Sequence, residues 1–501
     1  MYSASAFISI HLLPFDMSRN LTRRNFIAAS SGLSLASGAT SSALAETAPA
    51  KAKEKPNPIA IAAKKPIPQI APLDPVPGLP AIYAGPMLGH VTHNEAWLWI
   101  RATQDATWKV LVSEDAMFDH AMTFQGGAVN ENAAHTSAVR LHGLKPATRY
   151  HYQVLLNDRV VSPLPEPIFM TAPEAEHQGR LRVAFSSCVG RLPVDSSAAF
   201  GEMADRLDFD LLFMLGDNHY GDTTDLERQR LYYTAHRQIA GFRELGARKP
   251  VYAIWDDHDY GPNDSDSTAD GKIKSLQAFR EFWANAPREA NKDDQAIYYS
   301  FVRSGVEFFM LDVRWHRSPN RAPDGPDKTM LGRQQLEWLK QGLKTSKAKI
   351  KILASGSEWQ TNGHKDSWTS FNTERSALFD WLEEEGIEGV VLLSGDRHFS
   401  AGYHVRSRWP EFTAGPLGSP NERNAKAAVS AETFTVRYDG KMWMILDIDT
   451  SPETPQVSYE IWEAGEGMIE SRVLPVEVVK GLPYEMERSP LVKDILAQRG
   501  L

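Results

Sequence analysis

Short apolar runs alternate with longer amphipathic stretches through residues 180–478, which indicates the strand–loop–helix repeat of an α/β domain. The runs predict strands at 181–186, 211–215, 251–255, 306–311, 350–354 and 390–393. The amphipathic stretches predict helices that include 197–207, 274–285, 332–342 and 373–384. Two later runs, near 442–448 and 456–462, predict antiparallel strands that close the domain.

A different pattern precedes this domain. Residues 79–173 carry short alternating runs, such as 96–101 and 108–112, that are spaced like the strands of a small all-β sandwich. The segment from Leu144 to Tyr150 resembles the L-x-P-x-T-x-Y corner of fibronectin type III domains, in which the tyrosine hydroxyl bonds to nearby backbone. We therefore expect a fibronectin III-like domain that serves as a scaffold or as a wall of the substrate site.

The first 78 residues have the pattern of a targeting segment and a linker. Arg23 and Arg24 form a twin-arginine motif, and an apolar stretch and a small-x-small cleavage site ending at Ala45 follow them in order. This predicts a signal peptide over 1–45 that the twin-arginine translocase exports, and a periplasmic or secreted protein; either Met1 or Met17 could be the start. Residues 46–78, rich in Pro, Ala and Lys, predict a linker. No other stretch is apolar enough to predict a membrane span in the mature protein.

The composition narrows the possible partners. The formal net charge is −9 and no basic run recurs in the body of the chain, which argues against nucleic acid as the main partner. A hydrophobic content of 42% is ample for a packed core. The chain has one cysteine, so no internal disulfide can form. That cysteine, Cys188, is either buried and inert or a ligand or reactive thiol.

Acidic, histidine and phenol side chains follow the predicted strands. Ligands in open α/β sheets gather just past the carboxyl ends of the strands, so these residues should meet in one cleft. Carboxylates, imidazoles, a phenol and a thiol together indicate a metal site, with more than one ion. The positions that carry this prediction are Cys188, Asp217, Tyr220, Asp256, Asp257, His258, Asp259, Asp312, Asp396 and His398.

Individual motifs leave some alternatives open. Asp217 could bridge two cations and Tyr220 suits a hard ion such as ferric iron, although Gly-Asp after a strand is also a common turn. The acidic run 256–259 is either a cation site or a solvated loop, and its place after a strand favours the cation. Arg397 could hold a phosphoryl oxygen or pair with a carboxylate, and Arg314 and Arg317 have the same two possibilities. Residues of the loop after Ser355, namely Trp359, His364 and Trp368, could form a pocket wall or could pack in the core.

The ordered motifs SSC, GDxxY, WDDHD, LDxR and SGDRH resemble the PhoD-like alkaline phosphatase family of the calcineurin-like metallophosphoesterases, over roughly residues 80–475. The resemblance implies an αββα core of two stacked mixed sheets over 180–478, followed by a tail at 479–501. It also implies Fe³⁺ bound by Cys188, Asp217 and Tyr220, and Ca²⁺ or another divalent ion that shares Asp217 and has Asp257 and Asp396 as further ligands. His258 and His398 would line the same site. The segment after WDDH reads DYGPND and departs from the familiar pattern, which leaves the second metal and the substrate open.

These features predict an exported phosphoesterase that hydrolyses phosphate monoesters, diesters or both by in-line attack of a metal-bound hydroxide. His258 is the expected general acid, and Arg397 and His398 are further catalytic candidates. Phosphodiesterase or phospholipase D-like specificity is an alternative within the family. Two alternatives come from other classes: a hydrolase with Cys188 as nucleophile, and a non-catalytic metal-binding module.

Overall fold

The computed structural model describes residues 66–161, 167–287, 293–361 and 364–501. The predicted signal peptide and all of the predicted linker before Pro66 lie outside these residues. Within the described part of the chain, no helix is both long and apolar enough to cross a membrane.

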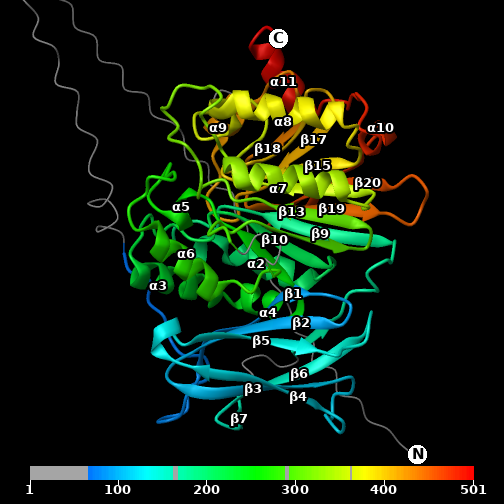
Figure 1. The fold of residues 1–501 in the computed structure, drawn as a ribbon. Coiled ribbons are helices and arrows are strands. Elements are labelled where there is room, and N and C mark those ends of the chain that lie inside the picture. Colours follow the sequence, from blue (N-terminus) through cyan, green and yellow to red (C-terminus); the bar gives the residue numbers. More distant parts are fainter. Residues whose placement is uncertain (1–65, 162–166, 288–292, 362–363) are drawn as a thin grey trace, which may run out of the picture. The chain divides into compact units, whose positions relative to one another are not determined.

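Two antiparallel sheets form the N-terminal region (Figure 1). The three-stranded sheet has the order β1 (Ile82–Val91), β2 (Glu95–Ala102), β5 (Thr136–His142). The five-stranded sheet comprises β4 (Met122–Val129), β3 (Ala106–Ser113), β6 (Arg149–Leu156), β7 (Arg159–Val160) and β8 (Ile168–Met170), and η1 (Glu131–Ala133) is a short 3₁₀ turn before β5. The backbone N–H of Lys145 donates to the hydroxyl of Tyr150 at 2.9 Å, which is the local tie that the corner motif predicts.

Two mixed sheets form the larger region. The six-stranded sheet has the order β11 (Val251–Ile254), β10 (Leu211–Leu215), β9 (Arg180–Ser186), β19 (Met442–Asp449), β20 (Gln456–Glu463), β21 (Gly467–Val473). The seven-stranded sheet has the order β12 (Tyr299–Arg303), β13 (Val306–Met310), β14 (Ile350–Ala354), β15 (Val390–Ser394), β17 (Trp409–Thr413), β16 (Ser400–Val405), β18 (Thr433–Arg437). The strands β9, β10 and β11 are parallel, as are β13, β14 and β15, so each sheet gathers several strand ends at one edge.

The two mixed sheets pack against each other through one apolar core. Phe213 of β10 meets Phe308 of β13 with the ring centroids 5.1 Å apart. Alternate residues of β13 face opposite ways: Phe308 joins the core between the sheets, and Phe309 joins a second core beneath helices. A strand that is buried on both faces is rich in apolar residues, and in β13 every residue except Glu307 is apolar.

Helices cover the outer faces of the sheets (Figure 1). Helices α7 (Gly332–Thr345) and α8 (Asn372–Glu384) pack on the seven-stranded sheet, whereas α2 (Pro193–Arg206) and α4 (Ala240–Arg248) pack on the six-stranded sheet. The other helical elements are α3 (Leu226–Arg237), α5 (Asp257–Tyr260), α6 (Lys272–Phe282), η3 (Trp368–Phe371), α9 (Glu422–Ala428), α10 (Val476–Val479) and α11 (Pro490–Gln498). The segment expected as a tail thus contains a helix, α11, that buries Val492 and Ile495.

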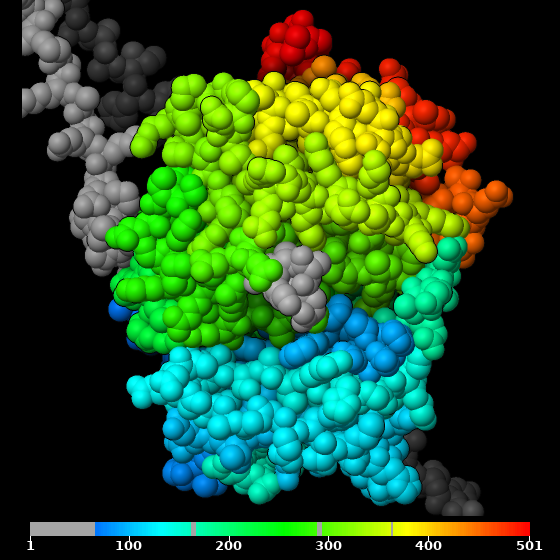
Figure 2. Space-filling model, in the orientation of Figure 1, coloured from blue at the N-terminus to red at the C-terminus, as the bar shows by residue number. Residues whose placement is uncertain are grey.

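The N-terminal sheets pack directly on this helical layer, and their blue and cyan surface adjoins the green surface of the larger region in Figure 2. The indole N–H of Trp99 donates to the carbonyl of Glu281 at 2.7 Å, and the hydroxyl of Tyr152 donates to the carbonyl of Ala247 at 2.8 Å. These are bonds between side chains of the sandwich and backbone of the helical layer, so the two regions are in direct contact.

The predicted strands and helices all occur, with small shifts at their ends. The largest shift is at α2, which begins at Pro193 rather than at residue 197. Proline is favoured in the first turn of a helix, and Oδ2 of Asp195 accepts the backbone N–H of Leu192 at 2.9 Å, so the start lies further upstream than the apolar pattern. The strands near 442–448 and 456–462 are antiparallel, as predicted.

Candidate active site

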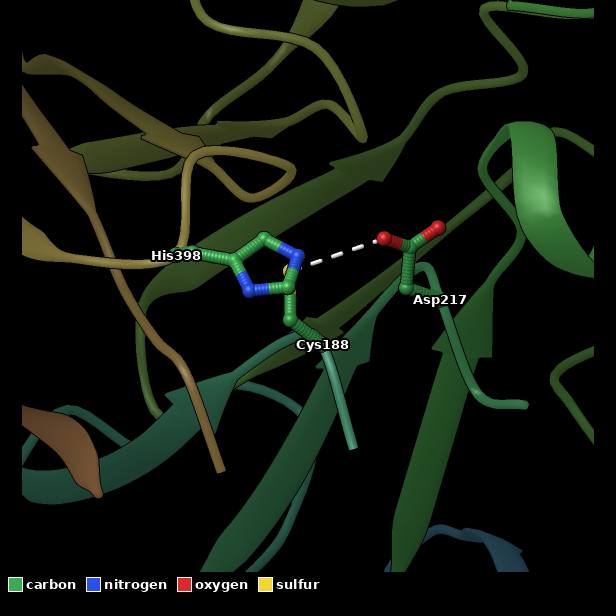
Figure 3. A group of neighbouring side chains, drawn as sticks. All are labelled: Cys188, Asp217 and His398. Carbon is green, nitrogen blue, oxygen red and sulfur yellow. Dashed lines mark hydrogen bonds between the residues drawn. The ribbon is translucent and has the colours of Figure 1, made fainter. Parts of the chain in front are cut away.

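Loops that follow strands of both mixed sheets meet at one place. Cys188 follows β9 and Asp217 follows β10, whereas His398 follows β15 of the other sheet. One ligand atom from each of the three lies within 4.8 Å of the others, and their side chains face one another in Figure 3. The convergence predicted from strand ends is therefore present, between residues that are far apart in the sequence.

The backbone at these positions is in the left-handed region. The φ angles of Cys188, Asp217, Asp396 and His398 are 57°, 52°, 68° and 60°. This region is uncommon for residues other than glycine, although Asp and His are tolerated better than most, and residues held there cluster at functional sites. The sharp turn after each strand directs the side chain back over the end of the sheet.

A phenol connects two of the predicted ligands. The Tyr220 hydroxyl donates to Oδ2 of Asp217 at 2.9 Å and lies 2.9 Å from Nε2 of His398. Nδ1 of His398 lies 2.6 Å from the carbonyl of Ser419, which can only accept, so Nδ1 carries the proton and Nε2 faces the site as an acceptor. The Cys188 thiol donates to the same oxygen of Asp217 at 3.6 Å.

Burial disfavours the charged forms of these groups. It raises the pKa of the Cys188 thiol to about 12, and it raises the pKa values of Asp217 and Tyr220 well above their ordinary values. A thiol that is fully buried with a raised pKa is a poor nucleophile, so the structure does not favour the Cys188 hydrolase. A cation bound between Cys188, Asp217 and Tyr220 would instead favour their deprotonated forms, because it stabilises the negative charge of all three.

A second cluster contains carboxylates only. Oxygens of Asp256, Asp257 and Asp396 lie within 4.8 Å of one another, and Asp257 also groups with Asp217 and His258. One oxygen of each of four carboxylates is buried and has no hydrogen-bond partner: Asp217 Oδ1, Asp256 Oδ2, Asp257 Oδ1 and Asp396 Oδ2. Buried polar atoms nearly always have a hydrogen-bond partner, so carboxylate oxygens that converge without one fit a site for cations.

Two buried arginines, Arg314 and Arg317, donate hydrogen bonds to carboxylates in and beside this cluster. Arg314 Nε donates to Oδ1 of Asp256 at 2.7 Å, and its NH2 group donates to Asp366 at 2.6 Å. Arg317 donates to the other oxygen of Asp366 at 2.7 Å. All these side chains are buried, and the arginines hold the pKa of Asp366 far below its ordinary value against the opposing effect of burial. The sequence left open whether Arg314 and Arg317 contact substrate phosphate or a carboxylate, and in the structure both contact carboxylates.

Arg397 also contacts carboxylates. Its Nε lies 3.2 Å from Oε2 of the buried Glu358, and its NH1 group lies 4.0 Å from Asp396. The contact in this structure is therefore a carboxylate pair. The aromatic residues of the neighbouring loop also pack: Trp359 and Trp368 stack with ring centroids 4.7 Å apart in the core beneath α7 and α8, while His364 Nδ1 lies 4.0 Å from Asp396.

His258 is paired with Asp222, which no sequence motif indicated. Its Nδ1 forms a short hydrogen bond with Oδ1 of Asp222, and its ring lies over that of Tyr220 with the centroids 4.2 Å apart. Burial lowers the pKa of His258, but Asp257, Asp217 and Asp222 together outweigh it and raise the value to about 10. These carboxylates thus favour the protonated ring of His258, in which Nε2 is the second donor beside Nδ1.

A cleft of about 450 Å³ opens over these groups. It is lined by Gly190, Arg191, Tyr220, Asp222, His258, Asn263, His398, Ser419, Pro420 and Asn421. Its deeper members include the buried Tyr220 and the half-buried His258, while Arg191, Asn263 and Ser419 are exposed at its mouth. A ligand that entered would pass polar groups at the mouth and would meet His258 and Tyr220 below them.

Three further residues of the site were not identified from the sequence: Asp222, Asp366 and Glu358. Asp222 could have been suspected, because it lies in the same loop as Asp217 and Tyr220. Asp366 and Glu358 lie in the long connection after β14, where no local pattern marks them. Their roles depend on which arginine they face across the fold.

Comparison with known proteins places the chain among phosphatases. The family model described as PhoD-like phosphatase matches residues 183–446, and a model described as a domain of unknown function (DUF7800) matches residues 80–174. Alkaline phosphatase D of Bacillus subtilis (strain 168) is 25% identical over 317 residues, which cover 53% of this chain and 54% of the relative. The match thus spans about half the length of that relative.

Two solved structures share the fold. A structure of PhoD superposes with a TM-score of 0.63 at 18% identity and covers 82% of this chain and 96% of its own. The purple acid phosphatase PPD1 from yellow lupin (Lupinus luteus) seeds superposes with a TM-score of 0.58 at 14% identity and covers 81% of this chain and 78% of its own.

Proposed function

The chain belongs to the PhoD-like phosphatase family, and we propose that it is a metal-dependent phosphoesterase that hydrolyses phosphate monoesters, diesters or both. The observation that carries the proposal is the convergence of four buried carboxylate oxygens without hydrogen-bond partners, next to Tyr220 and His258 of a polar cleft. Such an arrangement is costly for a protein without cations and suits the neutralisation of a phosphoryl group.

The residues divide into two cation sites. We propose that Cys188, Asp217 and Tyr220, with Nε2 of His398, hold ferric iron, because thiolate and phenolate are anionic donors. Asp217 would be shared with a second ion, Ca²⁺ or another divalent cation, that Asp257 and Asp396 also bind. When bound, the cations would activate water as the nucleophile and offset the charge that develops on the phosphoryl oxygens.

His258 is the proposed general acid. Asp222 accepts from Nδ1 and thereby fixes the ring, which leaves the proton on Nε2 for the oxygen of the leaving group. The raised pKa of His258, to which Asp222 contributes, favours the protonated ring that a general acid requires. Asp222 acts through His258 and is therefore a positioning residue.

Arg397 stays a predicted phosphoryl contact, although Glu358 holds its guanidinium in this structure. The twin-arginine signal and the periplasmic or secreted location also belong to the proposal. So does the likeness of residues 79–173 to fibronectin type III, for which the Tyr150 corner is the support.

The test is a substrate panel on the purified mature protein with total metal analysis of the same sample. Aryl and alkyl monoesters and a diester should reveal turnover that strong chelation abolishes and metal restores. Turnover that survives chelation but not a thiol reagent would favour the Cys188 hydrolase. A protein that retains stoichiometric metal and hydrolyses none of these esters would be a metal-binding module instead.

A further inference from the structure

Arg191 brings a fixed positive charge to the mouth of the cleft. It lies on the loop between Cys188 and helix α2, and it lines the cleft together with Tyr220 and His258. Of the described residues that line the cleft, Arg191 alone carries a guanidinium or ammonium group. No described carboxylate lies within ion-pair distance of it, in contrast to Arg314, Arg317 and Arg397.

The backbone on both sides of Arg191 is held in place. The N–H of Val189 donates to the carbonyl of Asp217 at 3.2 Å, and the N–H of Gly418 donates to the carbonyl of Cys188 at 2.9 Å. On the other side, the N–H of Leu192 donates to Oδ2 of Asp195 at 2.9 Å. An exposed arginine on a fastened loop is preorganised to bind, because little backbone freedom is lost when a ligand arrives.

The charged groups differ in burial, and this difference indicates which end of a substrate each of them would contact. The carboxylate oxygens without hydrogen-bond partners are buried next to Tyr220 and His258, and the transferred phosphoryl group must sit at the floor of the cleft, close to the cations proposed there. His258, which would protonate the leaving oxygen, lines the cleft above this floor, and Arg191 lies exposed beyond it. The part of the substrate that reaches Arg191 is therefore the leaving group and not the phosphoryl group.

We propose that Arg191 determines substrate specificity by binding a second anionic group, carried by the leaving group of the phosphate ester. The guanidinium pairs with carboxylate and with phosphate through the same two parallel hydrogen bonds, so both are members of this class. The inference rests on the proposed phosphoesterase function and adds the substrate class to it.

Matched pairs of substrates test this proposal. 3-Phosphoglycerate and glycerol 3-phosphate differ by a carboxylate on the leaving group, and fructose 1,6-bisphosphate and fructose 6-phosphate differ by a second phosphate. We expect the wild-type protein to prefer the more anionic member of at least one pair. In Arg191→Gln the ratio of kcat/KM within that pair should fall about 10- to 100-fold, the loss expected for a charge-assisted hydrogen-bond pair. Arg191→Lys should restore part of the ratio.

Controls separate charge loss from local binding. Arg333→Gln removes an exposed arginine on helix α7 and should leave the ratio unchanged. The pair that responds identifies the anion as carboxylate, phosphate or both. An unchanged ratio in Arg191→Gln, with equal losses on both members or none, overturns the proposal.

Isothermal titration calorimetry distinguishes failure of the phosphoesterase proposal from failure of the Arg191 proposal. If the wild-type protein hydrolyses no ester, the phosphoesterase function fails, and the same compounds are titrated as ligands. Tighter binding of the more anionic member that Arg191→Gln abolishes supports an anion subsite without that function. Equal binding of both members by wild-type protein refutes it.

Discussion

The hydroxyl of Tyr220 lies 2.9 Å from Nε2 of His398, across 178 positions of sequence. It also lies 2.9 Å from Oδ2 of Asp217. A phenol has one hydrogen, so it can donate to only one of these two atoms, and Oδ2 of Asp217 also accepts from the Cys188 thiol. If the phenol lost its proton, all three atoms could instead bind a shared cation. This relationship connects the proposed chemistry to several measurable properties.

The first prediction concerns the identity of the ion. Ferric iron bound by phenolate should give the purified protein a visible charge-transfer band, and Tyr220→Phe should abolish or strongly shift that band. Absorption spectra and iron content measured on the same samples check this. Tyr484→Phe, which removes a buried hydroxyl that lines a different cavity, should keep the band. Colourless, iron-free protein with full activity would show that the ferric assignment is wrong.

The second prediction concerns the shared carboxylate. Asp217→Asn removes charge where two cations are proposed, so metal content should fall and turnover should drop more than about a hundredfold. Asparagine tolerates the left-handed backbone at this position, so the fold should persist. Metal analysis, turnover and circular dichroism check this. Asp447→Asn, on strand β19 and paired with Arg182, is the control that should keep its metals. Near-normal turnover in Asp217→Asn would rule out the shared role.

The third prediction concerns pH and metal-free protein. Burial raises the pKa of Asp256 to about 6 and that of Asp259 to about 7. A carboxyl whose pKa is higher in the folded state stabilises the fold below its unfolded pKa of about 4, and this contribution is lost as pH rises through the folded value. Without metal, Tm should therefore fall between about pH 4 and pH 7. Added metal should reduce this fall, since cations near Asp256 favour its charged form. A Tm that rises across this window without metal would contradict the account.

The fourth prediction separates acid catalysis from ligation at His258. As a general acid, His258→Ala should lower turnover of an alkyl ester by roughly two to four powers of ten with the metals retained. The loss should be smaller for nitrophenyl phosphate, whose leaving group needs little protonation. Asp222→Asn should show the same difference between substrates at smaller magnitude, and His93→Ala, outside the site, should show none. Equal losses on both esters together with a missing metal would make His258 a ligand.

The fifth prediction concerns export. Replacing Arg23 and Arg24 with lysine should block the twin-arginine route, and folded, metal-loaded precursor should accumulate in the cytoplasm. Cell fractionation followed by blotting checks this. Undiminished export of the double variant would exclude the route.

Much of the fold could be predicted because its strands are buried on both faces. A strand such as Leu211–Leu215, which is buried at every position, has to be apolar along its length, and that pattern depends little on the rest of the molecule. The same holds for the polar residues at strand ends, since parallel topology brings them to one edge. Cys188, Asp217 and His398 could be placed together on this basis.

The pairings within the site could not be predicted in this way. Whether Arg314 holds a phosphate or Asp366 depends on the path of the loop after β14, which no periodicity reports. The partner of His258 depends on the turn after Tyr220, which brings Asp222 back over the ring. Such contacts arise from side-chain geometry in the completed fold, and single-sequence patterns carry no record of it.

The six-stranded sheet supplies Cys188, Asp217 and Asp257, and the seven-stranded sheet supplies Asp396 and His398. Neither sheet could bind the ions strongly by itself, so high affinity would arise only after the two have docked. A bound cation would then link the two sheets and stabilise their contact. Its removal should speed amide hydrogen exchange at this edge of both sheets and leave their opposite edges unaffected.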